Sequence, residues 1–469
     1  MRIFQQLRVF FSSLFLLFVI STICSSQSLT ADDRSKIDMV ASKVLATTGV
    51  PSASIAIVKD GQIVYAKAYG KARLEPEMAA TPEMRYSIGS VSKQFTVAAI
   101  LMLAEQGKLS LDDPVGKFIP HLTRASEVTI RELLSHTSGY QDYWPQDYVM
   151  PMMLQPVSTS EILDRWARIP LDFDPGTKWQ YSNTNYVIAG VIFEKAAGVS
   201  LLNFLTEHVF TPLHMTTVQN IDQEKLTDSD PIAYLRYALG PPRPAPKEGK
   251  GWLFAAGELA MTASDLARWD ISLMDQKLLK PASYHEMETE VRLKNGVGTQ
   301  YGLGLDVSNE DGHRKISHTG EVSGFVANNV VYPDDRTAIV VLTNQDASTA
   351  ANQIANLIRP LLFPVQDRSK DAELQSVRTI LAGLQHGAID RALFTSNCNA
   401  YFTDQALRDV ADSLGPLGTP NEFKQTSYSE RGGMSFRAYT VKWGSKSARV
   451  TTFQMPDGKL EQYLVIAME

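Results

Sequence analysis

Residues 86–95 read Tyr86-Ser-Ile-Gly-Ser90-Val-Ser-Lys93-Gln-Phe95 and lead into a long apolar stretch that ends near Gln106-Gly107. From Phe95 to Ala104 almost every side chain is apolar, which predicts a helix that is buried on most sides. A helix that begins at or just before Ser90 places this serine three residues from Lys93 on the same face. The hydroxyl and the amine are then within reach of each other.

This spacing suits nucleophilic catalysis. A serine hydroxyl is a weak nucleophile until a neighbouring base removes its proton, and a lysine is such a base only when its amine is neutral. Burial in apolar surroundings lowers the pKa of a lysine and so favours the neutral amine. The helix N-terminus adds free N–H groups that stabilise a developing oxyanion. By chance alone, however, a Ser-x-x-Lys spacing arises about once or twice in a chain of this length.

Two further motifs follow along the chain. Tyr181-Ser-Asn183 comes after a Pro-Gly turn on an irregular connection, where catalytic groups are often found. A tyrosine can pass on a proton when cations depress its pKa, and an asparagine can hold a substrate carbonyl or amide. His318-Thr-Gly320 lies among β-branched runs that predict sheet strands. Each motif on its own also fits a purely structural role.

Taken together, the three motifs resemble those of serine hydrolases of the class C β-lactamase and D-alanyl-D-alanine carboxypeptidase type, a group that also contains esterases and D-aminopeptidases. Two more segments, Leu133-Leu-Ser-His-Thr-Ser-Gly139 and Asp174-Pro-Gly-Thr177, are similar to segments typical of that family. The resemblance covers about residues 33–362. It implies an α/β (α+β) fold of the β-lactamase/transpeptidase type, with an antiparallel sheet flanked by helices and a mostly helical inserted lobe.

The resemblance also implies roles for the site residues. Ser90 would attack a carbonyl and form an acyl-enzyme, with Lys93 and Tyr181 as general base and acid. The backbone N–H groups of Ser90 and Glu321 would form the oxyanion hole. Substrate binding would involve Asn183, His318, Thr319 and Gly320. No metal or cofactor is expected, and no His-Glu-x-x-His spacing occurs.

A loop rich in aromatic residues follows Gly139. We expect its Trp144 to line the substrate cleft, although plain loop packing explains such aromatic residues equally well.

His318 and Glu321 bear on the substrate. β-Lactamases of the family usually carry lysine at the position of His318, whereas carboxypeptidase and esterase members often carry histidine. A histidine with its normal pKa of about 6.5 is only partly charged near neutral pH, so activity should change as His318 titrates. The carboxylate of Glu321 would repel anionic substrates unless it points outward from its strand.

We therefore expect an esterase or a D-amino-acid peptidase or carboxypeptidase that acts on a small molecule or peptide. A class C-type β-lactamase is one alternative. A non-catalytic pseudoenzyme that binds peptidoglycan or a partner is another.

The N-terminus predicts export. Met1–Ser26 carries Arg2 and Arg8, then an apolar run and small residues, which is the pattern of a cleaved signal peptide in a secreted or periplasmic protein. An uncleaved membrane anchor and a lipoprotein attached at Cys24 are the alternatives. Loss of the two arginines changes the formal net charge from −6 to −8. This acidity argues against nucleic acid as a partner.

Local patterns predict further elements. Asp60-Gly61 between two β-rich runs predicts a hairpin of strands at 53–58 and 63–69, and Thr129-x-x-Glu132 predicts a helix-starting capping box. Helical patterns occupy 32–48, 160–169, 257–274 and 348–362.

A second domain is expected after residue 362. The composition changes across a linker at 363–370. Residues 371–469 then show helical patterns at 374–384 and 406–414, followed by strand-like runs at 435–443, 448–453 and 460–467. This order predicts a small α+β domain, similar to the cone-shaped NTF2-like fold. Once Cys24 is removed, Cys398 is the only cysteine, which excludes an intrachain disulfide.

Overall fold

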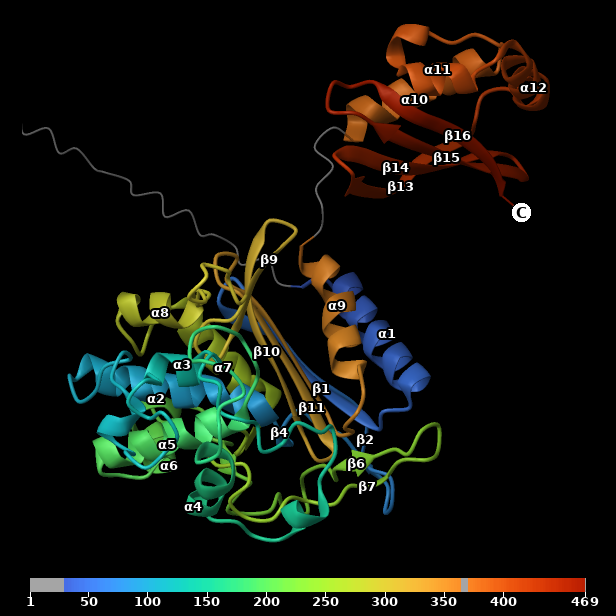
Figure 1. The fold of residues 1–469 in the computed structure, drawn as a ribbon. Coiled ribbons are helices and arrows are strands. Elements are labelled where there is room, and N and C mark those ends of the chain that lie inside the picture. Colours follow the sequence, from blue (N-terminus) through green and yellow to red (C-terminus); the bar gives the residue numbers. More distant parts are fainter. Residues whose placement is uncertain (1–28, 364–369, 469) are drawn as a thin grey trace, which may run out of the picture. The chain divides into compact units, whose positions relative to one another are not determined.

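The computed structural model describes residues 29–363 and 370–468 (Figure 1). The chain divides into two compact units at Leu361–Leu362, and each unit is described by itself. The expected signal segment, Met1–Ser26, lies outside the described residues, as does most of the expected linker at 363–370.

A seven-stranded antiparallel sheet forms the centre of the first unit. Strands from the two ends of the unit lie side by side in it, because β1 pairs with β12 along its length, from Ala53 opposite Thr343 to Val58 opposite Ala338. The strands, in spatial order, are β3 (Met78–Ala79), β2 (Gln62–Arg73), β1 (Ser52–Lys59), β12 (Thr337–Thr343), β11 (Phe325–Tyr332), β10 (His313–Val322) and β9 (Asp306–Glu310).

The hairpin of β1 and β2 confirms the predicted Asp-Gly turn. Asp60 and Gly61 both have positive φ, 52° and 74°, as a type I′ turn requires. Asp60 and Gly61 thus set the register with which β2 returns along β1.

Helices cover both faces of this sheet, so its central strands are buried throughout (Figure 1). On one face lie α1 (Ala31–Thr48) and α9 (Ala350–Leu362), close to their expected ranges. On the other face, α7 (Ala263–Met274) packs against β1, β2 and β12. The helix predicted at 257–274 is therefore wrong in its first part, where Leu259–Met261 forms strand β8.

Strand β8 helps to position the Ser90 segment. It lies between β4 (Tyr86–Ser87) and β5 (Gln219–Asn220) in a small three-stranded sheet. The Leu259 carbonyl accepts the N–H of Ile88, which extends this pairing to the residues just before the serine.

The helical lobe is built around α2 (Lys93–Glu105), whose residues 93–103 are all buried, as predicted. Its α-helical part begins later than expected, because Ser90 lies on a preceding 3₁₀ turn, η1 (Gly89–Ser92). The capping box of Thr129 and Glu132 opens α3 as predicted. The other elements of the lobe are α3 (Ile130–Leu134), α4 (Thr159–Ile162) with the π turn η4 (Leu163–Ala167), α5 (Asn183–Ala197), α6 (Leu201–Leu205) with the π turn η5 (Thr206–Phe210), and α8 (Pro281–Glu288).

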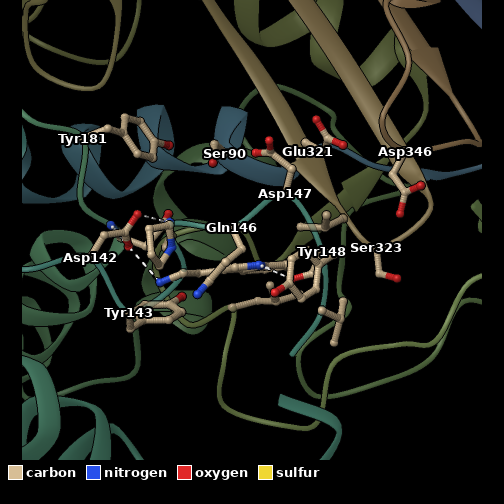
Figure 2. Close-up of a pocket in the computed structure, with 18 of the residues that line it drawn as sticks. Ser90, Asp142, Tyr143, Gln146, Asp147, Tyr148, Tyr181, Glu321, Ser323 and Asp346 are labelled. Carbon is tan, nitrogen blue, oxygen red and sulfur yellow. Dashed lines mark hydrogen bonds between the residues drawn. The ribbon is translucent and has the colours of Figure 1, made fainter. Parts of the chain in front are cut away.

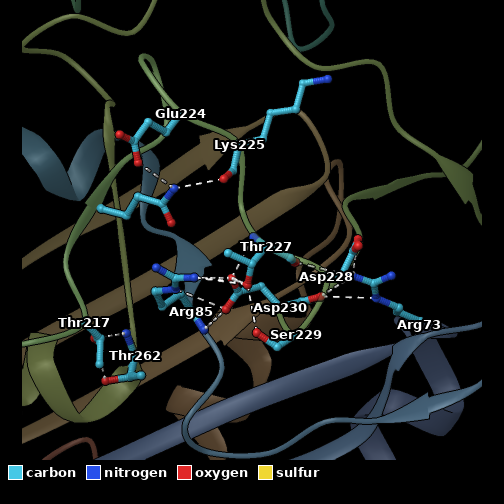
Figure 3. A network of polar contacts seen from close by, with 11 residues as sticks. Arg73, Arg85, Thr217, Glu224, Lys225, Thr227, Asp228, Ser229, Asp230 and Thr262 are labelled. Carbon is cyan, nitrogen blue, oxygen red and sulfur yellow. Dashed lines mark hydrogen bonds and ion pairs between the residues drawn. The ribbon is translucent and has the colours of Figure 1, made fainter.

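A polar network anchors the start of the Ser90 segment (Figure 3). Arg85 forms an ion pair with the buried carboxylate of Asp230, with 2.6 Å between Nη2 and Oδ2. The same carboxylate accepts the backbone N–H groups of Arg85 and Thr227 at 3.0 and 2.9 Å. This network attaches β4 to the loop before the short hairpin of β6 (Tyr234–Leu235) and β7 (Arg243–Pro244).

The second unit has helices followed by an antiparallel sheet, the order that its sequence predicts. The helices are α10 (Lys370–Leu384), α11 (Ser396–Tyr401) and α12 (Asp404–Leu414). The sheet has the sequential order β13 (Glu422–Arg431), β14 (Met434–Trp443), β15 (Lys446–Gln454) and β16 (Leu460–Met468). Its core, which includes Leu381, Tyr439 and Tyr463, is separate from that of the first unit.

Across the described ranges, no single helix has both the length and the apolar composition needed to cross a bilayer. The bent pair Asn183–Ala197 and Leu201–Phe210 meets that requirement only when the two helices are taken together.

Candidate active site

Ser90 lies where η1 meets strand β10, and two glycines permit that approach. Gly89 has a φ of 49°, and a Cβ on it would lie 2.7 Å from the backbone nitrogen of Glu321. A Cβ on Gly320 would overlap the carbonyl oxygen of Ile88 and lie 3.0 Å from the nitrogen of Ser90. The backbones of η1 and β10 are therefore in direct contact at the predicted oxyanion hole.

The edge of β10 that faces η1 is not covered by β9 at this point. The pairing of β9 with β10 ends at Ser317 opposite Asp306, whereas β11 continues to pair with β10 as far as Val322. The edge from His318 to Val322 therefore faces η1 and the serine.

Lys93 makes three hydrogen bonds through its amine. The Nζ atom lies 2.9 Å from Ser90 Oγ, 2.8 Å from Asn183 Oδ1 and 2.8 Å from the carbonyl oxygen of Ala256. The side chain is fully buried, and burial lowers its pKa from 10.5 to about 7, while the charge of Asp142 acts in the opposite direction. A large share of the amine is therefore neutral at neutral pH and can accept the serine proton.

The phenol of Tyr181 lies near the Ser90 side chain, which affects the tyrosine pKa. Its ring centroid lies 5.0 Å from Lys93 Nζ. Burial raises the pKa of Tyr181 above its usual value, although the Ser90 side chain opposes this. The tyrosine thus keeps its proton, and the structure does not provide the depressed tyrosine pKa that the sequence argument invoked.

Asn183, the first residue of α5, is held by a carboxylate that the motifs did not single out. Asp142 Oδ1 accepts the backbone N–H groups of Asn183 and Trp144 at 2.9 and 3.1 Å. Burial raises the pKa of Asp142, and the hydrogen bonds from these two N–H groups and the charge of Lys93 oppose that rise. Asp142 thus fixes the start of α5 next to the lysine.

His318 is buried and neutral, which corrects the expectation that it titrates near neutral pH. The Tyr301 hydroxyl donates to His318 Nε2 at 2.9 Å, and His318 Nδ1 donates to the carbonyl oxygen of Thr319. Burial, together with the charge of Lys93, lowers the pKa of His318 from 6.5 to about 3. The imidazole therefore carries no charge with which to bind a substrate carboxylate.

The other predicted site residues differ in where they lie. Thr319 and Trp144 line the cleft, and the Trp144 ring nitrogen donates to the Tyr148 carbonyl at 3.0 Å. Gly320 does not line the cleft, and it contributes through its close packing on Ile88. The Glu321 side chain does line the cleft, and its carboxylate accepts the N–H of Ala347 at 2.7 Å.

The cleft above Ser90 has a volume of about 580 Å³ and is lined by residues of the aromatic loop, of β10 and of the start of α5. Figure 2 shows the serine and Tyr181 with four carboxylates that line the cleft, those of Asp142, Asp147, Glu321 and Asp346. Burial raises the pKa of Glu321, and the charges of Asp346 and Asp147 raise it further. The described residues that line this cleft include no lysine or arginine.

The described part of the chain also contains no group of three or more His, Cys, Asp or Glu side chains arranged to hold a metal ion.

Comparisons with known proteins identify the family and the fold. Residues 37–361 match the family described as Beta-lactamase. The chain is 29% identical over 349 residues to penicillin-binding protein 4* of Bacillus subtilis (strain 168), an alignment that covers 70% of this chain and 77% of that protein.

Solved structures share the fold. The octameric penicillin-binding protein homologue from Pyrococcus abyssi matches with a TM-score of 0.62 at 23% identity, over 92% of this chain and 100% of that chain. The D-stereospecific amidohydrolase from a Streptomyces species matches with a TM-score of 0.60 at 25% identity, over 68% of this chain and 96% of that chain.

Proposed function

The chain belongs to the beta-lactamase family of serine hydrolases, and on that premise we propose that it cleaves an ester or amide through an acyl-enzyme on Ser90. The observation that carries this proposal is the buried amine of Lys93, 2.9 Å from the serine oxygen and with its pKa lowered to about 7. A serine hydroxyl next to a buried, neutral lysine amine at a cleft is an activated nucleophile.

The proposed reaction has two halves. Lys93 accepts the Ser90 proton as the serine oxygen attacks the substrate carbonyl, and the N–H groups of Ser90 and Glu321 stabilise the oxyanion. Tyr181, protonated in the free enzyme, donates its proton to the leaving group and is reprotonated from Lys93. Water then attacks the acyl-enzyme. Lys93 and Tyr181 remove the proton of this water and return a proton to the Ser90 oxygen as the ester bond breaks. Asn183 holds the substrate through its side-chain amide.

The charge of the cleft supports a substrate that lacks a carboxylate near the scissile bond. Four carboxylates line the cleft, no cationic side chain lines it among the described residues, and His318 is neutral. An anionic substrate would have no opposite charge to bind and would be repelled by Glu321. We therefore favour an esterase or a D-amino-acid amidase or peptidase over a β-lactamase or a carboxypeptidase, whose substrates carry a carboxylate.

A panel of substrates tests this choice. Wild type should hydrolyse p-nitrophenyl esters or D-amino-acid amides faster than nitrocefin or D-Ala-D-Ala peptides, and Ser90→Ala should hydrolyse none of them. Preferential turnover of nitrocefin would instead support the β-lactamase alternative. Absence of any covalent adduct with a fluorophosphonate or a fluorescent penicillin would support the pseudoenzyme.

Export is part of the proposal, on the basis of the basic and apolar Met1–Ser26 segment. N-terminal sequencing of the protein recovered from the periplasm or medium should find the chain beginning after that segment. A full-length chain in the membrane fraction would point to an uncleaved anchor.

A further inference from the structure

His136 lies in the buried segment that follows α3, and its backbone is in an unusual conformation. It has a φ of 59°, in the left-handed region, and none of its surface is exposed. That conformation costs a residue with a side chain about 1–3 kcal/mol, and such strain is concentrated at functional sites. A reason for this strain should therefore be found in what the side chain contacts.

The contacts of His136 surround Tyr181. The His136 carbonyl accepts the N–H of Gln180 at 3.0 Å, and its Nδ1 accepts the N–H of Ser182 at 3.2 Å. Its ring lies against the Tyr181 ring, with 4.2 Å between the centroids and 35° between the planes. The backbone on both sides of the tyrosine and the tyrosine ring itself are thus held by one residue.

Space filling alone does not explain the imidazole. Because Nδ1 accepts a hydrogen bond, the proton of the neutral ring is on Nε2, and Nε2 is buried without a hydrogen-bond partner among the described residues. A buried N–H without an acceptor costs about 1–3 kcal/mol. A phenylalanine would fill the same space without that cost, but it could not accept the N–H of Ser182.

The surroundings keep this acceptor available. Burial lowers the pKa of His136 well below its usual value, and the charge of Lys93 lowers it further. The ring therefore stays neutral, with Nδ1 free of a proton. Two more aromatic rings, those of Tyr301 and Tyr186, lie 5.0 and 5.3 Å from it and fix its plane.

We propose that His136 is a positioning residue that holds the Tyr181 hydroxyl against Ser90. This role rests on the proposed function, in which Tyr181 transfers a proton. Protonation of the leaving group requires the Tyr181 oxygen to lie about 2.6–3.2 Å from the leaving atom at Ser90, and a misplacement of about 1 Å can reduce a rate by about 100-fold. Loss of the Nδ1 acceptor should therefore reduce the rate of Ser90 acylation by about 10- to 100-fold.

Two substitutions separate the two contacts. His136→Phe keeps the aromatic ring but removes the acceptor. His136→Asn places an oxygen near the position of Nδ1 and tolerates the left-handed backbone, but removes the ring. His214 provides a matched control, because it also has a left-handed φ, of 55°, but is exposed. His214→Phe and His214→Asn should leave acylation unchanged.

The experiment measures the second-order rate of fluorophosphonate labelling of the full chain, together with thermal unfolding. His136→Phe should be labelled about 10- to 100-fold more slowly than wild type, and His136→Asn should recover part of that loss. In a Tyr181→Phe background, either His136 substitution should add less than about a threefold change, because the residue acts through the tyrosine.

The proposal would be overturned if a His136 substitution reduced the labelling rate by the same factor in the Tyr181→Phe background as in the wild type. A normal labelling rate in a folded His136→Phe would also overturn it. Should His136→Phe not fold, the comparison with and without Tyr181→Phe is made with His136→Asn, which has lost the ring contact. A wild type that is not labelled refutes the proposed function instead. In that case crystal structures of the wild type and of His136→Phe decide the positioning role, since an unmoved Tyr181 hydroxyl in the variant without the acceptor contradicts it.

Discussion

The pKa of Lys93 should determine how the rate of Ser90 acylation depends on pH. With a pKa of about 7, about half of the molecules hold a neutral amine at pH 7, compared with about one in 3000 for a lysine at 10.5. Below pH 7 the neutral fraction falls about tenfold for each pH unit, so about 1% remains at pH 5. The rate of acylation should fall in the same proportion.

Asp142→Asn provides the perturbation. The carboxylate of Asp142 favours the charged amine, so its removal should lower the pKa of Lys93 and move the acid limb of the profile to lower pH. The asparagine oxygen still accepts the N–H groups of Trp144 and Asn183, so the start of α5 should keep its position. The assay is fluorophosphonate labelling between pH 5 and 9, for wild type and Asp142→Asn. Lys93→Arg, which cannot deprotonate in this range, is the control and should remain unlabelled at all pH values.

Two results would refute this reasoning. A flat profile for wild type from pH 5 to 9 would mean that Lys93 is not the titrating base. A shift of the acid limb to higher pH in Asp142→Asn would mean that the carboxylate does not stabilise the charged amine.

Four further predictions follow from the geometry. Ser90→Ala should lose at least about 1000-fold in hydrolysis without loss of thermal stability, and retained turnover would exclude an acyl-enzyme on this serine. Gly320→Ala should reduce labelling strongly, because the added Cβ overlaps the Ile88 carbonyl; a normal labelling rate would mean that this contact does not shape the site. Ring ¹⁵N NMR should find His318 neutral down to pH 5, since burial lowers its pKa to about 3; titration between pH 5 and 8 would contradict its described burial. Asp230→Asn should reduce the free energy of unfolding in urea by about 2–3 kcal/mol at pH 7. Burial raises the pKa of Asp230, but the bonds from Arg85 outweigh this effect and hold the pKa below its usual value. The difference in stability between wild type and Asp230→Asn should therefore disappear as the pH falls below about 4.

Elements set by local chemistry were predictable from the sequence. The Asp60-Gly61 turn and the capping box at Thr129 depend on a few neighbouring residues, and the structure confirms both. The buried helix after Lys93 is confirmed for the same reason, because its apolar run has no polar face. The predicted helix over 257–261 is wrong because Leu259–Met261 pairs with two strands distant in sequence, a contact that no local pattern encodes.

The residues of the candidate site also fall into those that the sequence predicted and those that only the fold brings to the site. Ser90 and Lys93 were recognised by their spacing, and Tyr181 and Asn183 were assigned from the family resemblance. The structure brings all four together. Asp142 was missed because it lies in an aromatic loop with no spacing that relates it to α5. Tyr301 and His136 were not assigned to the site, since their relevance arises from ring contacts with His318 and Tyr181 that only the fold creates.

One physical cause accounts for both the proposed chemistry and the proposed specificity. Burial lowers the pKa of Lys93 to about 7, so that about half of the amines are neutral at neutral pH, and the same burial removes the charge from His318. The first effect yields a base for Ser90, whereas the second deprives the cleft of the cation that an anionic substrate would need. The carboxylates that line the cleft, those of Asp142, Asp147, Glu321 and Asp346, then determine the sign of its charge. The same desolvation that activates the serine thus also underlies the proposed preference for ester and amide substrates without a carboxylate.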